Sequence, residues 1–269
     1  MSDKRVIITG AASGIGEATK AEFERRGARV IGLDLNAGDD SLISCDVRDQ
    51  ASVDRAVAEA IERLGGLDVL VNNAGLATPQ SAGLPPDEKA HAVIDVNLMG
   101  PWRVTSAALP ALREARGRVV NVASGMAFVA LPFAAAYAMS KHGVPAYSGA
   151  LRLEHGDAIT VTTVYPGVVK TPIHKDSEEF GLGADGASPV ETLESAVAAL
   201  ARAALEDPPR RDIVTTRTGK VTTALSRFAP RRLVDKIILR QFRKNMAGKN
   251  FDHAAPPVGE FARRLGGQE

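Results

Sequence analysis

The chain has 269 residues, of which 45% are hydrophobic and 24% charged, so it can bury a large core without disulfides or metals. Its net charge of +1 points to no class of partner, and its single cysteine, Cys45, excludes an internal disulfide. We expect Cys45 to be a small core residue of a cytoplasmic protein, because an unpaired thiol suits a reducing compartment. The opening segment, MSDKRVIITG, holds an apolar run too short for a signal peptide.

Apolar runs alternate with helical patterns along most of the chain. Short runs rich in β-forming residues predict strands at 5–9, 29–34, 42–45, 68–73, 118–124, 159–166 and 211–216. Helical spacing predicts helices at 14–27, between Asp49 and Gly65, and at 88–114, 135–155 and 189–206. Several strands are continuous Val, Ile and Leu runs, which is typical of parallel strands buried on both faces. We therefore expect an α/β fold: a doubly wound parallel sheet of about seven strands with helices on both faces.

Residues 119–140 contain no charged side chain and are long enough to span a bilayer. Asn121, Ser124, Gly125 and Pro132 interrupt this stretch. We therefore interpret it as a buried strand, a turn and the start of a buried helix.

The first strand leads directly into the glycine-rich segment TGAASGIG. Gly10, Gly14 and Gly16 lie where the strand turns into a helix, and their missing Cβ atoms permit a tight turn and the close approach of a pyrophosphate. The N-terminus of the following helix offers free N–H groups to phosphates. Asp34 ends the second strand, 18 residues beyond Gly16, near the distance expected for a ribose-binding carboxylate. Asp34 could alternatively cap a helix or a turn.

Tyr137 and Lys141 are four residues apart in the segment AAAYAMSKHG, so they share a face of the predicted helix. A phenol has an ordinary pKa near ~10, and a fixed cation beside it favours the phenolate and lowers that value. The pair could therefore be a proton donor and the cation that tunes it. The alternative is an ordinary solvated helix face.

Six short motifs follow one another in a fixed order between residues 5 and 216. They are TGAASGIG (9–16), NNAG (72–75), Asn97 in VIDVNLMG, Ser124 placed 13 residues before Tyr137, YAMSK (137–141) and YPGVVKT (165–171). In sequence and spacing they match the motifs of the short-chain dehydrogenase/reductase family. The chain thus resembles a single-domain, NAD-dependent member of that family, which implies a Rossmann-like fold.

The resemblance implies four catalytic residues: Asn97, Ser124, Tyr137 and Lys141. Tyr137 would be the general acid–base at the alcohol or carbonyl oxygen, and Ser124 would hold the same oxygen by a hydrogen bond. Lys141 would lower the pKa of Tyr137 and bind the nicotinamide ribose. Asn97 would bend its helix and hold a water that relays protons from Lys141. Hydride would pass between the substrate and the nicotinamide of NAD.

The resemblance also implies which residues bind NAD. They are Gly10, Ser13, Gly14, Ile15, Gly16, Asp34, Asp46, Val47, Asn73, Ala74, Gly75, Tyr137, Lys141, Pro166, Gly167, Val169 and Thr171. Ser13 and Leu35 occupy the two positions where the family usually has a basic residue for NADP, which favours NAD. Asp46 could instead cap a turn, and we expect Asn72 to tie neighbouring strands by backbone hydrogen bonds. The five histidines show no metal-ligand spacing, so we expect no metal.

The segment GMAFVALPFAAA between Ser124 and Tyr137 is wholly apolar and should line the substrate side of the site. Its large side chains Met126, Phe128, Val129 and Phe133 favour an apolar secondary alcohol or ketone of steroid, terpenoid or fatty type. These side chains could equally pack the core or a subunit interface. Residues 173–188 resemble the family's mobile lid in position. An NADP-dependent carbonyl reductase and a catalytically idle NAD-binding scaffold are the alternative functions.

We expect a dinucleotide-binding and catalytic domain at 1–216 and a basic helical extension at 217–269. Residues 210–249 hold 12 Lys or Arg against two Asp. Val234, Ile238, Phe242 and Met246 recur every four residues, and Arg232, Lys236, Arg240, Arg243 and Lys244 cluster across from them. Such a helix can lie on an anionic membrane, or dock its apolar face on its own core or a second subunit. No motif indicates nucleic-acid binding, and the resemblance implies a homodimer or homotetramer.

Overall fold

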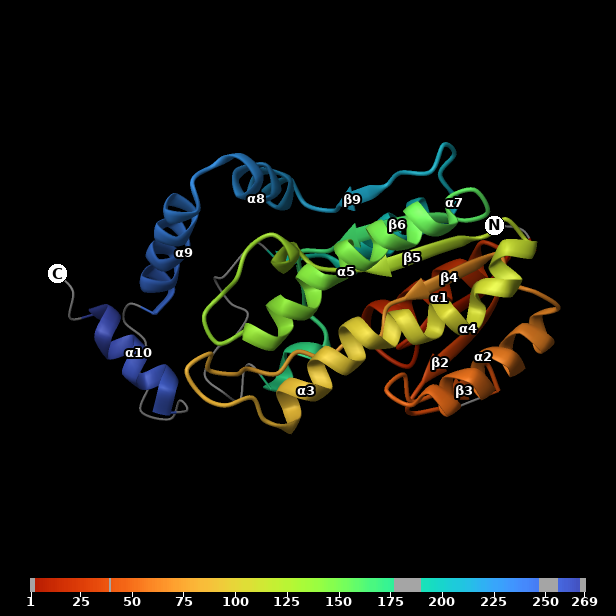
Figure 1. Cartoon of the computed structure of the whole chain (residues 1–269), viewed down its shortest axis with the longest axis horizontal. Coiled ribbons are helices and arrows are strands. Elements are labelled where there is room, and N and C mark those ends of the chain that lie inside the picture. Colours follow the sequence, from red (N-terminus) through yellow and green to blue (C-terminus); the bar gives the residue numbers. More distant parts are fainter. Residues whose placement is uncertain (1–2, 39, 177–189, 247–255, 267–269) are drawn as a thin grey trace.

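The computed structural model describes residues 3–38, 40–176, 190–246 and 256–266. A parallel sheet crosses the molecule in the strand order β3-β2-β1-β4-β5-β6-β9 (Figure 1). Its strands are β1 (Arg5–Thr9), β2 (Arg29–Asp34), β3 (Leu42–Ser44), β4 (Val69–Asn72), β5 (Arg118–Val122), β6 (Thr160–Tyr165) and β9 (Asp212–Val214). A separate parallel pair joins β7 (Val168–Val169) to β8 (Val190–Glu191). The predicted doubly wound α/β sheet is confirmed.

Helices cover both faces of the sheet. The first face carries α1 (Gly14–Arg25) and α7 (Leu193–Leu205), and the second carries α2 (Gln50–Leu64), α4 (Gly100–Glu114) and α5 (Ala135–His155). The side chains of β1 alternate between the two layers: Val6 and Ile8 belong to the core under α1 and α7, and Ile7 belongs to the core under α2 and α4. All three are fully buried, which explains why this strand is continuously apolar.

The strand order reverses at β1, which pairs with β2 on one side and with β4 on the other. The chain leaves β1 toward β2 and β3, then crosses back to continue from β4 toward β9. The connections after β1 and β4 therefore diverge, and ligands of open α/β sheets bind in the crevice at this place. The fold thus puts the glycine-rich loop and the NNAG motif side by side.

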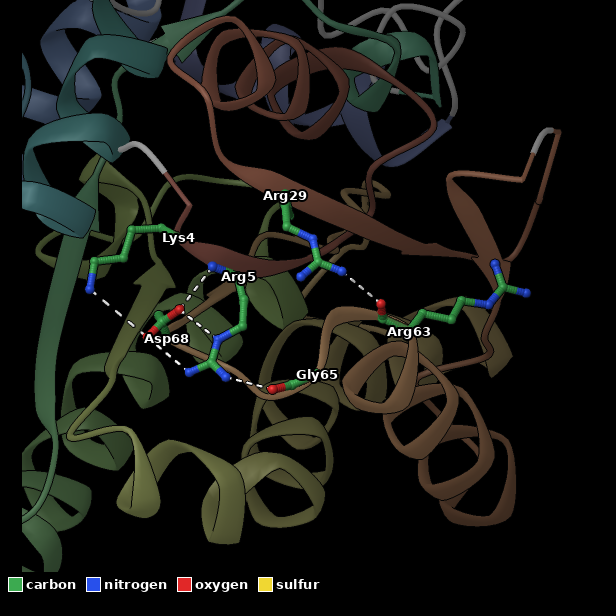
Figure 2. Close-up of polar contacts among 6 residues, drawn as sticks. All are labelled: Lys4, Arg5, Arg29, Arg63, Gly65 and Asp68. Carbon is green, nitrogen blue, oxygen red and sulfur yellow. Dashed lines mark hydrogen bonds and ion pairs between the residues drawn. The ribbon is translucent and has the colours of Figure 1, made fainter.

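Polar contacts join the amino ends of the central strands, at the end of the sheet opposite the glycine loop (Figure 2). The carboxylate of Asp68, just before β4, accepts hydrogen bonds from both the backbone N–H and the Nε–H of Arg5, each at 2.9 Å. Arg5 also donates to the carbonyl oxygen of Gly65 at 2.6 Å, and Arg29 donates to the carbonyl oxygen of Arg63 at 2.9 Å. These contacts fix the starts of β1, β2 and β4 relative to α2, far from the glycine loop.

Helix ends agree with the sequence in some places and not in others. The side chain of Asp49 caps α2 by accepting from the N–H of Ala51, and Gly65 ends it with a φ of +73°, as predicted. The helix predicted over 88–114 has these bounds, but a π-helical turn (Asp95–Met99) separates α3 (Glu88–Ile94) from α4 within it. The helix predicted from residue 189 begins only at α7, because β8 precedes it.

The chain continues beyond β9 into three further helices. They are α8 (Arg217–Phe228), α9 (Arg231–Met246) and α10 (Pro256–Gly266), drawn in blue beyond one end of the sheet in Figure 1. The ring of Phe261 in α10 lies 5.3 Å from that of Phe133 and 6.1 Å from that of Phe242, between ring centroids. In the described part of the chain, no helix is both long and apolar enough to cross a membrane. Most of the expected lid, 177–188, lies outside the described residues.

Candidate active site

The loop between β1 and α1 forms a cradle that requires glycine. Gly10 and Gly14 have φ angles of +66° and +57°, which residues with a side chain rarely adopt. A Cβ atom on Gly16 would lie 1.9 Å from the carbonyl oxygen of Gly10. Helix α1 begins at Gly14, so its free N–H groups lie at this cradle. The loop therefore fits the pyrophosphate of a dinucleotide cofactor.

Hydrogen bonds tie the end of β4 to the end of β1. The hydroxyl oxygen of Thr9 accepts from the backbone N–H groups of Asn73 and Ala74, both at 3.0 Å. The side-chain amide of Asn73 donates to the carbonyl oxygens of Thr9 and Gly10, at 3.0 and 3.1 Å. This network fixes residues 73–75 beside the glycine loop. It also occupies the N–H groups of Asn73 and Ala74, so a cofactor would meet other atoms of these residues.

Asn72 has a structural position behind this network. It pairs with Asn121 in the β4–β5 ladder, as predicted. Its side-chain amide also donates to Oδ1 of Asn121 at 2.8 Å and to Oγ1 of Thr105 in α4 at 2.9 Å. Asn72 thus joins two strands and a helix by its side chain as well as by its backbone.

Asp34 ends β2 with both carboxylate oxygens fixed by backbone donors. Oδ2 accepts from the N–H of Ala12 and Oδ1 from the N–H of Asn36, each at 3.0 Å. The side chain is half-buried and lines a cavity beside the glycine loop. Leu35, next to it, is 59% exposed and brings no charge. Asp34 therefore caps a turn and also offers a negative charge to the cavity.

Asp46 follows β3 and forms an ion pair that the sequence did not reveal. Its Oδ1 accepts from the N–H of Arg48 at 2.9 Å, as in the predicted turn cap, and its oxygens accept from the Arg48 guanidinium at 2.7–3.1 Å. Arg48 holds the pKa of Asp46 below its usual range, against the effect of burial. Val47 and Cys45 are buried and line the same cavity. Burial raises the pKa of the Cys45 thiol to about 11, so this thiol is neutral.

Asn97 lies at the centre of the π-helical turn between α3 and α4. Its Oδ1 accepts from the N–H of Leu76 at 2.7 Å, and its Nδ2 donates to the carbonyl oxygen of Leu76 at 2.8 Å and to Oγ of Ser140 at 3.1 Å. The π-helical turn interrupts the regular α-helix here, and the predicted bend stays a prediction. Through these hydrogen bonds its side chain links the loop after β4 to α5. Asn97 is buried and does not line the cavity. Its water-holding role stays a prediction.

Ser124 and Tyr137 stand at the two ends of the apolar loop 125–134. Ser124 follows β5 and caps a short 3₁₀ turn by accepting from the N–H of Met126 at 3.2 Å, and Tyr137 lies in the first turn of α5. Burial raises the pKa of Tyr137, and a hydrogen bond with Ser124 opposes that rise only in part. The expected lowering of this pKa is therefore wrong for the protein alone, and the phenol is protonated at neutral pH.

Lys141 lies one helical turn beyond Tyr137, with Nζ 5.7 Å from the centroid of the Tyr137 ring. Its ammonium is buried and donates to the carbonyl oxygen of Val122 at 3.0 Å. Burial lowers the pKa of Lys141 to about 8, so the side chain is still mostly charged at neutral pH. Both side chains line the cavity, which rules out the alternative of a solvated helix face.

The segment 166–171 follows β6 and is held from behind by Glu191, which sequence reasoning missed. Oε2 of Glu191 accepts from the N–H of Gly167 at 2.7 Å and from the hydroxyl of Thr215 at 2.6 Å. Oε1 accepts from the hydroxyl of Ser195 at 2.7 Å. The carboxylate is 5% exposed, and these three donors are neutral. Glu191 therefore ties this segment to the end of β9 and to α7.

One cavity of about 1300 Å³ connects these elements. Of the predicted site residues, Gly16 and Asn97 lie behind its wall. The others line it: Gly10, Ser13, Gly14, Ile15, Asp34, Asp46, Val47, Asn73, Ala74, Gly75, Ser124, Tyr137, Lys141, Pro166, Gly167, Val169 and Thr171. Among the residues that the structure describes, no group of three or more His, Cys, Asp or Glu is placed to hold a metal ion.

The apolar loop contributes to the cavity only in part. Met126, Val129 and Phe133 line it. Phe128 instead packs against Tyr165, with ring centroids 4.8 Å apart, and does not reach the cavity. The expected substrate-side role of Phe128 is therefore wrong, and the alternative of core packing holds for this residue.

Helices α8 and α9 supply a wall of the cavity that sequence reasoning did not assign. The lining side chains from these helices include Thr218, Thr222, Leu225, Val234, Ile237, Ile238, Gln241 and Phe242. The apolar face expected from the four-residue spacing of Val234, Ile238 and Phe242 is half-buried and faces the cavity. The side chain of Met246, the fourth member, lies outside the described ones. In the sequence, the four-residue spacing of these apolar side chains was the one sign that α9 buries a face.

Known proteins resemble this chain in both sequence and structure. A family model described as short chain dehydrogenase matches residues 4–180. The chain belongs to the short-chain dehydrogenase family. It is 33% identical over 224 residues to the oxidoreductase UcpA of Escherichia coli strain K12, covering 77% of this chain and 84% of that protein. It is 39% identical over 189 residues to retinol dehydrogenase 16 of Mus musculus, covering 64% and 59%.

Solved structures agree with this assignment. The 3-ketoacyl-(acyl-carrier-protein) reductase of Brucella melitensis, complexed with NADH, is 26% identical with a TM-score of 0.69, covering 79% of this chain and 96% of that chain. As a short-chain dehydrogenase, the chain is an oxidoreductase that uses a nicotinamide cofactor. Complexes with NADH and with NADP both occur among the similar structures, so family membership leaves the choice of cofactor open.

Proposed function

We propose that this short-chain dehydrogenase transfers hydride between NAD(H) and an apolar secondary alcohol or its ketone, with Tyr137 as the acid–base. One observation carries the proposal. The phenol of Tyr137 shares a single cavity with the glycine cradle and with apolar side chains from the loop 125–134 and from α8–α9. A cofactor on the cradle and an apolar substrate on the far walls would therefore meet at this phenol.

The residues around Tyr137 suit proton transfer at a carbonyl oxygen. Its raised pKa keeps the phenol protonated, so it can donate a proton to the oxygen as the carbon gains hydride. Ser124 can hold the same oxygen by a hydrogen bond and stabilise its developing negative charge. The buried ammonium of Lys141, with one donor on the Val122 carbonyl, has further N–H groups for a cofactor ribose. When bound, the nicotinamide supplies or accepts the hydride.

Asp34 supports NAD as the cofactor. Its carboxylate can accept hydrogen bonds from the adenosine ribose hydroxyls, and the phosphate that replaces one of them in NADP would meet a like charge. The positively charged side chain of Arg48 lines the cavity near Asp34, where it could pair with the phosphate of NADP. Its guanidinium already binds Asp46, however.

The size and lining of the cavity support a bulky apolar substrate. Ligand pockets typically enclose about 300–1,000 Å³, and this cavity of about 1300 Å³ has room for a substrate beside the cofactor. Phe133, Val234, Ile238 and Phe242 surround the space away from the glycine loop. Retinol dehydrogenase 16, a relative at 39% identity, is named for a long apolar alcohol. On this proposal residues 1–216 form the catalytic domain, and the extension 217–269 completes its substrate side.

A panel of secondary alcohols of increasing chain length, with NAD and the purified full chain, tests the proposal. NADH absorbance should appear, and kcat/KM should rise with chain length. Each CH₂ group that the cavity buries stabilises the bound substrate by about 0.8 kcal/mol. Ile238→Trp should fill the cavity and lower kcat/KM for long alcohols more than for short ones. Leu239→Trp is the matched control, since that side chain is 39% exposed and does not line the cavity. Turnover restricted to small polar alcohols would contradict the proposal.

We also propose a cytoplasmic homodimer or homotetramer, as is common in the family. Light scattering of the purified chain would give its mass directly. A monomer that turns over normally would contradict this part of the proposal while leaving the site chemistry intact.

A further inference from the structure

Helices α8 and α9 expose an unusual amount of apolar surface. Among the described residues, 13 large hydrophobic side chains are exposed. Six of these lie on α8 and α9: Val221, Leu225, Phe228, Leu233, Ile237 and Leu239. Phe228 is 81% exposed and Val221 59%. Val221, Leu225 and Phe228 follow the spacing i, i+4, i+7, so they share one face of α8. We call the exposed side of residues 217–246 the α8–α9 surface.

The same segment carries charge of almost one sign. Residues 217–246 hold nine Lys or Arg and one acidic residue, Asp235. In the described part of the chain, Arg232, Lys236 and Arg240 form no ion pair. These three residues lie on α9 across from the cavity-lining Val234, Ile238 and Phe242, so their charges point toward solvent. Their charge is therefore available to a partner.

The exposed apolar surface continues into the cavity. Leu225 and Ile237 are 43% and 50% exposed, and both also line the cavity. These side chains therefore stand at an edge where the cavity wall passes into the outer surface. Figure 1 shows that α8 and α9 lie beyond one end of the sheet.

We propose that the α8–α9 surface binds an anionic lipid bilayer. Exposed Phe, Leu, Ile and Val side chains would enter the boundary between headgroups and acyl chains, and the Lys and Arg side chains would pair with anionic headgroups. A second copy of this surface is a poorer occupant, because a symmetric contact would bring the two sets of positive charges together. Binding of this kind does not depend on the proposed function. If that function also holds, an apolar substrate could pass from the bilayer to the cavity at Leu225 and Ile237.

Sedimentation with large vesicles tests the proposal on the full chain. Vesicles of phosphatidylcholine with about 30% phosphatidylserine should retain the protein at least about tenfold better than phosphatidylcholine alone. Raising NaCl to about 0.5 M should weaken the binding, because it shortens the screening length. The absence of sedimentation with either vesicle overturns the proposal, and so does equal, salt-independent binding to both.

Variants localise the contact. Lys236→Glu with Arg240→Glu should abolish the preference for phosphatidylserine, and Phe228→Ser with Leu233→Ser should weaken binding at every lipid composition. Arg55→Glu with Arg202→Glu changes the net charge equally but lies on α2 and α7, so it should have little effect. An equal loss in this control pair would mean that only net charge matters and would overturn the assignment to α8–α9. The proposal would also be overturned if the wild type did not bind vesicles while Phe228→Ser with Leu233→Ser changed the mass of the oligomer. That result would make the α8–α9 surface a contact between subunits. Circular dichroism melts would confirm that each variant is folded.

Discussion

Asp34 should make the protein prefer NAD to NADP. Backbone N–H groups at 3.0 Å hold both of its carboxylate oxygens, so the side chain cannot swing away from a phosphate without losing these bonds. Arg48 is engaged by Asp46, so it does not neutralise Asp34. The phosphate on the adenosine ribose of NADP would therefore face an uncompensated negative charge.

The magnitude follows from the spacing of the charges. Two unit charges ~4 Å apart repel by about 4 kcal/mol at an effective dielectric of 20. Asp34 is only half-buried, so solvent lowers this value. We expect about 1.4–3 kcal/mol, which corresponds to a preference for NAD of about 10- to 150-fold.

The assay is kcat/KM for both cofactors with one substrate at one ionic strength. Asp34→Asn removes the charge and keeps the shape of the side chain, so the ratio of the two values should move toward unity. Adding Leu35→Arg should narrow or reverse the preference further. Glu17→Gln is a matched control, because it removes a carboxylate from the first turn of α1 outside the cavity lining. Equal wild-type values, or a preference for NADP, would refute this reasoning about Asp34.

Four further outcomes are expected. Tyr137→Phe should lower kcat by about 10²–10⁴-fold with NADH affinity retained, and more than about a tenth of wild-type turnover would exclude it as the acid–base. The difference in the free energy of unfolding between the wild type and Lys141→Met should rise between pH 8 and 10. In this range Lys141, with its pKa of about 8, binds fewer protons in the folded state than in the unfolded state. Urea titrations that give the same difference at every pH would contradict a buried ammonium. Glu191→Ala should weaken NADH binding, measured by fluorescence, because the N–H of Gly167 and the hydroxyls of Thr215 and Ser195 lose their acceptor. Gly16→Ala should destabilise the fold and abolish cofactor binding, whereas Gly38→Ala, with no atom within 4 Å of its Cβ, should change neither.

The fold could be predicted because its signals are local and mutually consistent. Continuous apolar runs gave the buried parallel strands, and Asp49 and Gly65 marked the two ends of α2 through turn chemistry that depends on single residues. The break at 95–99 could not be predicted from periodicity. It depends on Asn97, whose side chain binds the backbone of Leu76, 21 residues away in sequence.

In the candidate site too, local spacing predicts some residues, and only the fold brings the others together. The glycine cradle and the shared face of Tyr137 and Lys141 follow from spacing, so the sequence placed them together. Glu191 has no motif, since its three donors come from segments that only the fold assembles. Phe128 resembled its apolar neighbours in the sequence, and only the packing against Tyr165 separates it from the cavity.

The pKa of Tyr137 shows most clearly what spacing cannot supply. A lysine four residues away predicted a lowered pKa, but burial acts on both groups and disfavours each charged form: it raises the pKa of the phenol and lowers that of the ammonium. In the protein alone the site therefore holds a protonated phenol, which is the form that the proposed reduction of a ketone requires. The proposed oxidation of an alcohol requires the phenolate. The positive charge of the oxidised nicotinamide would favour that form when the cofactor binds, so the charge of the cofactor would set the protonation state of Tyr137 to match the direction of the reaction.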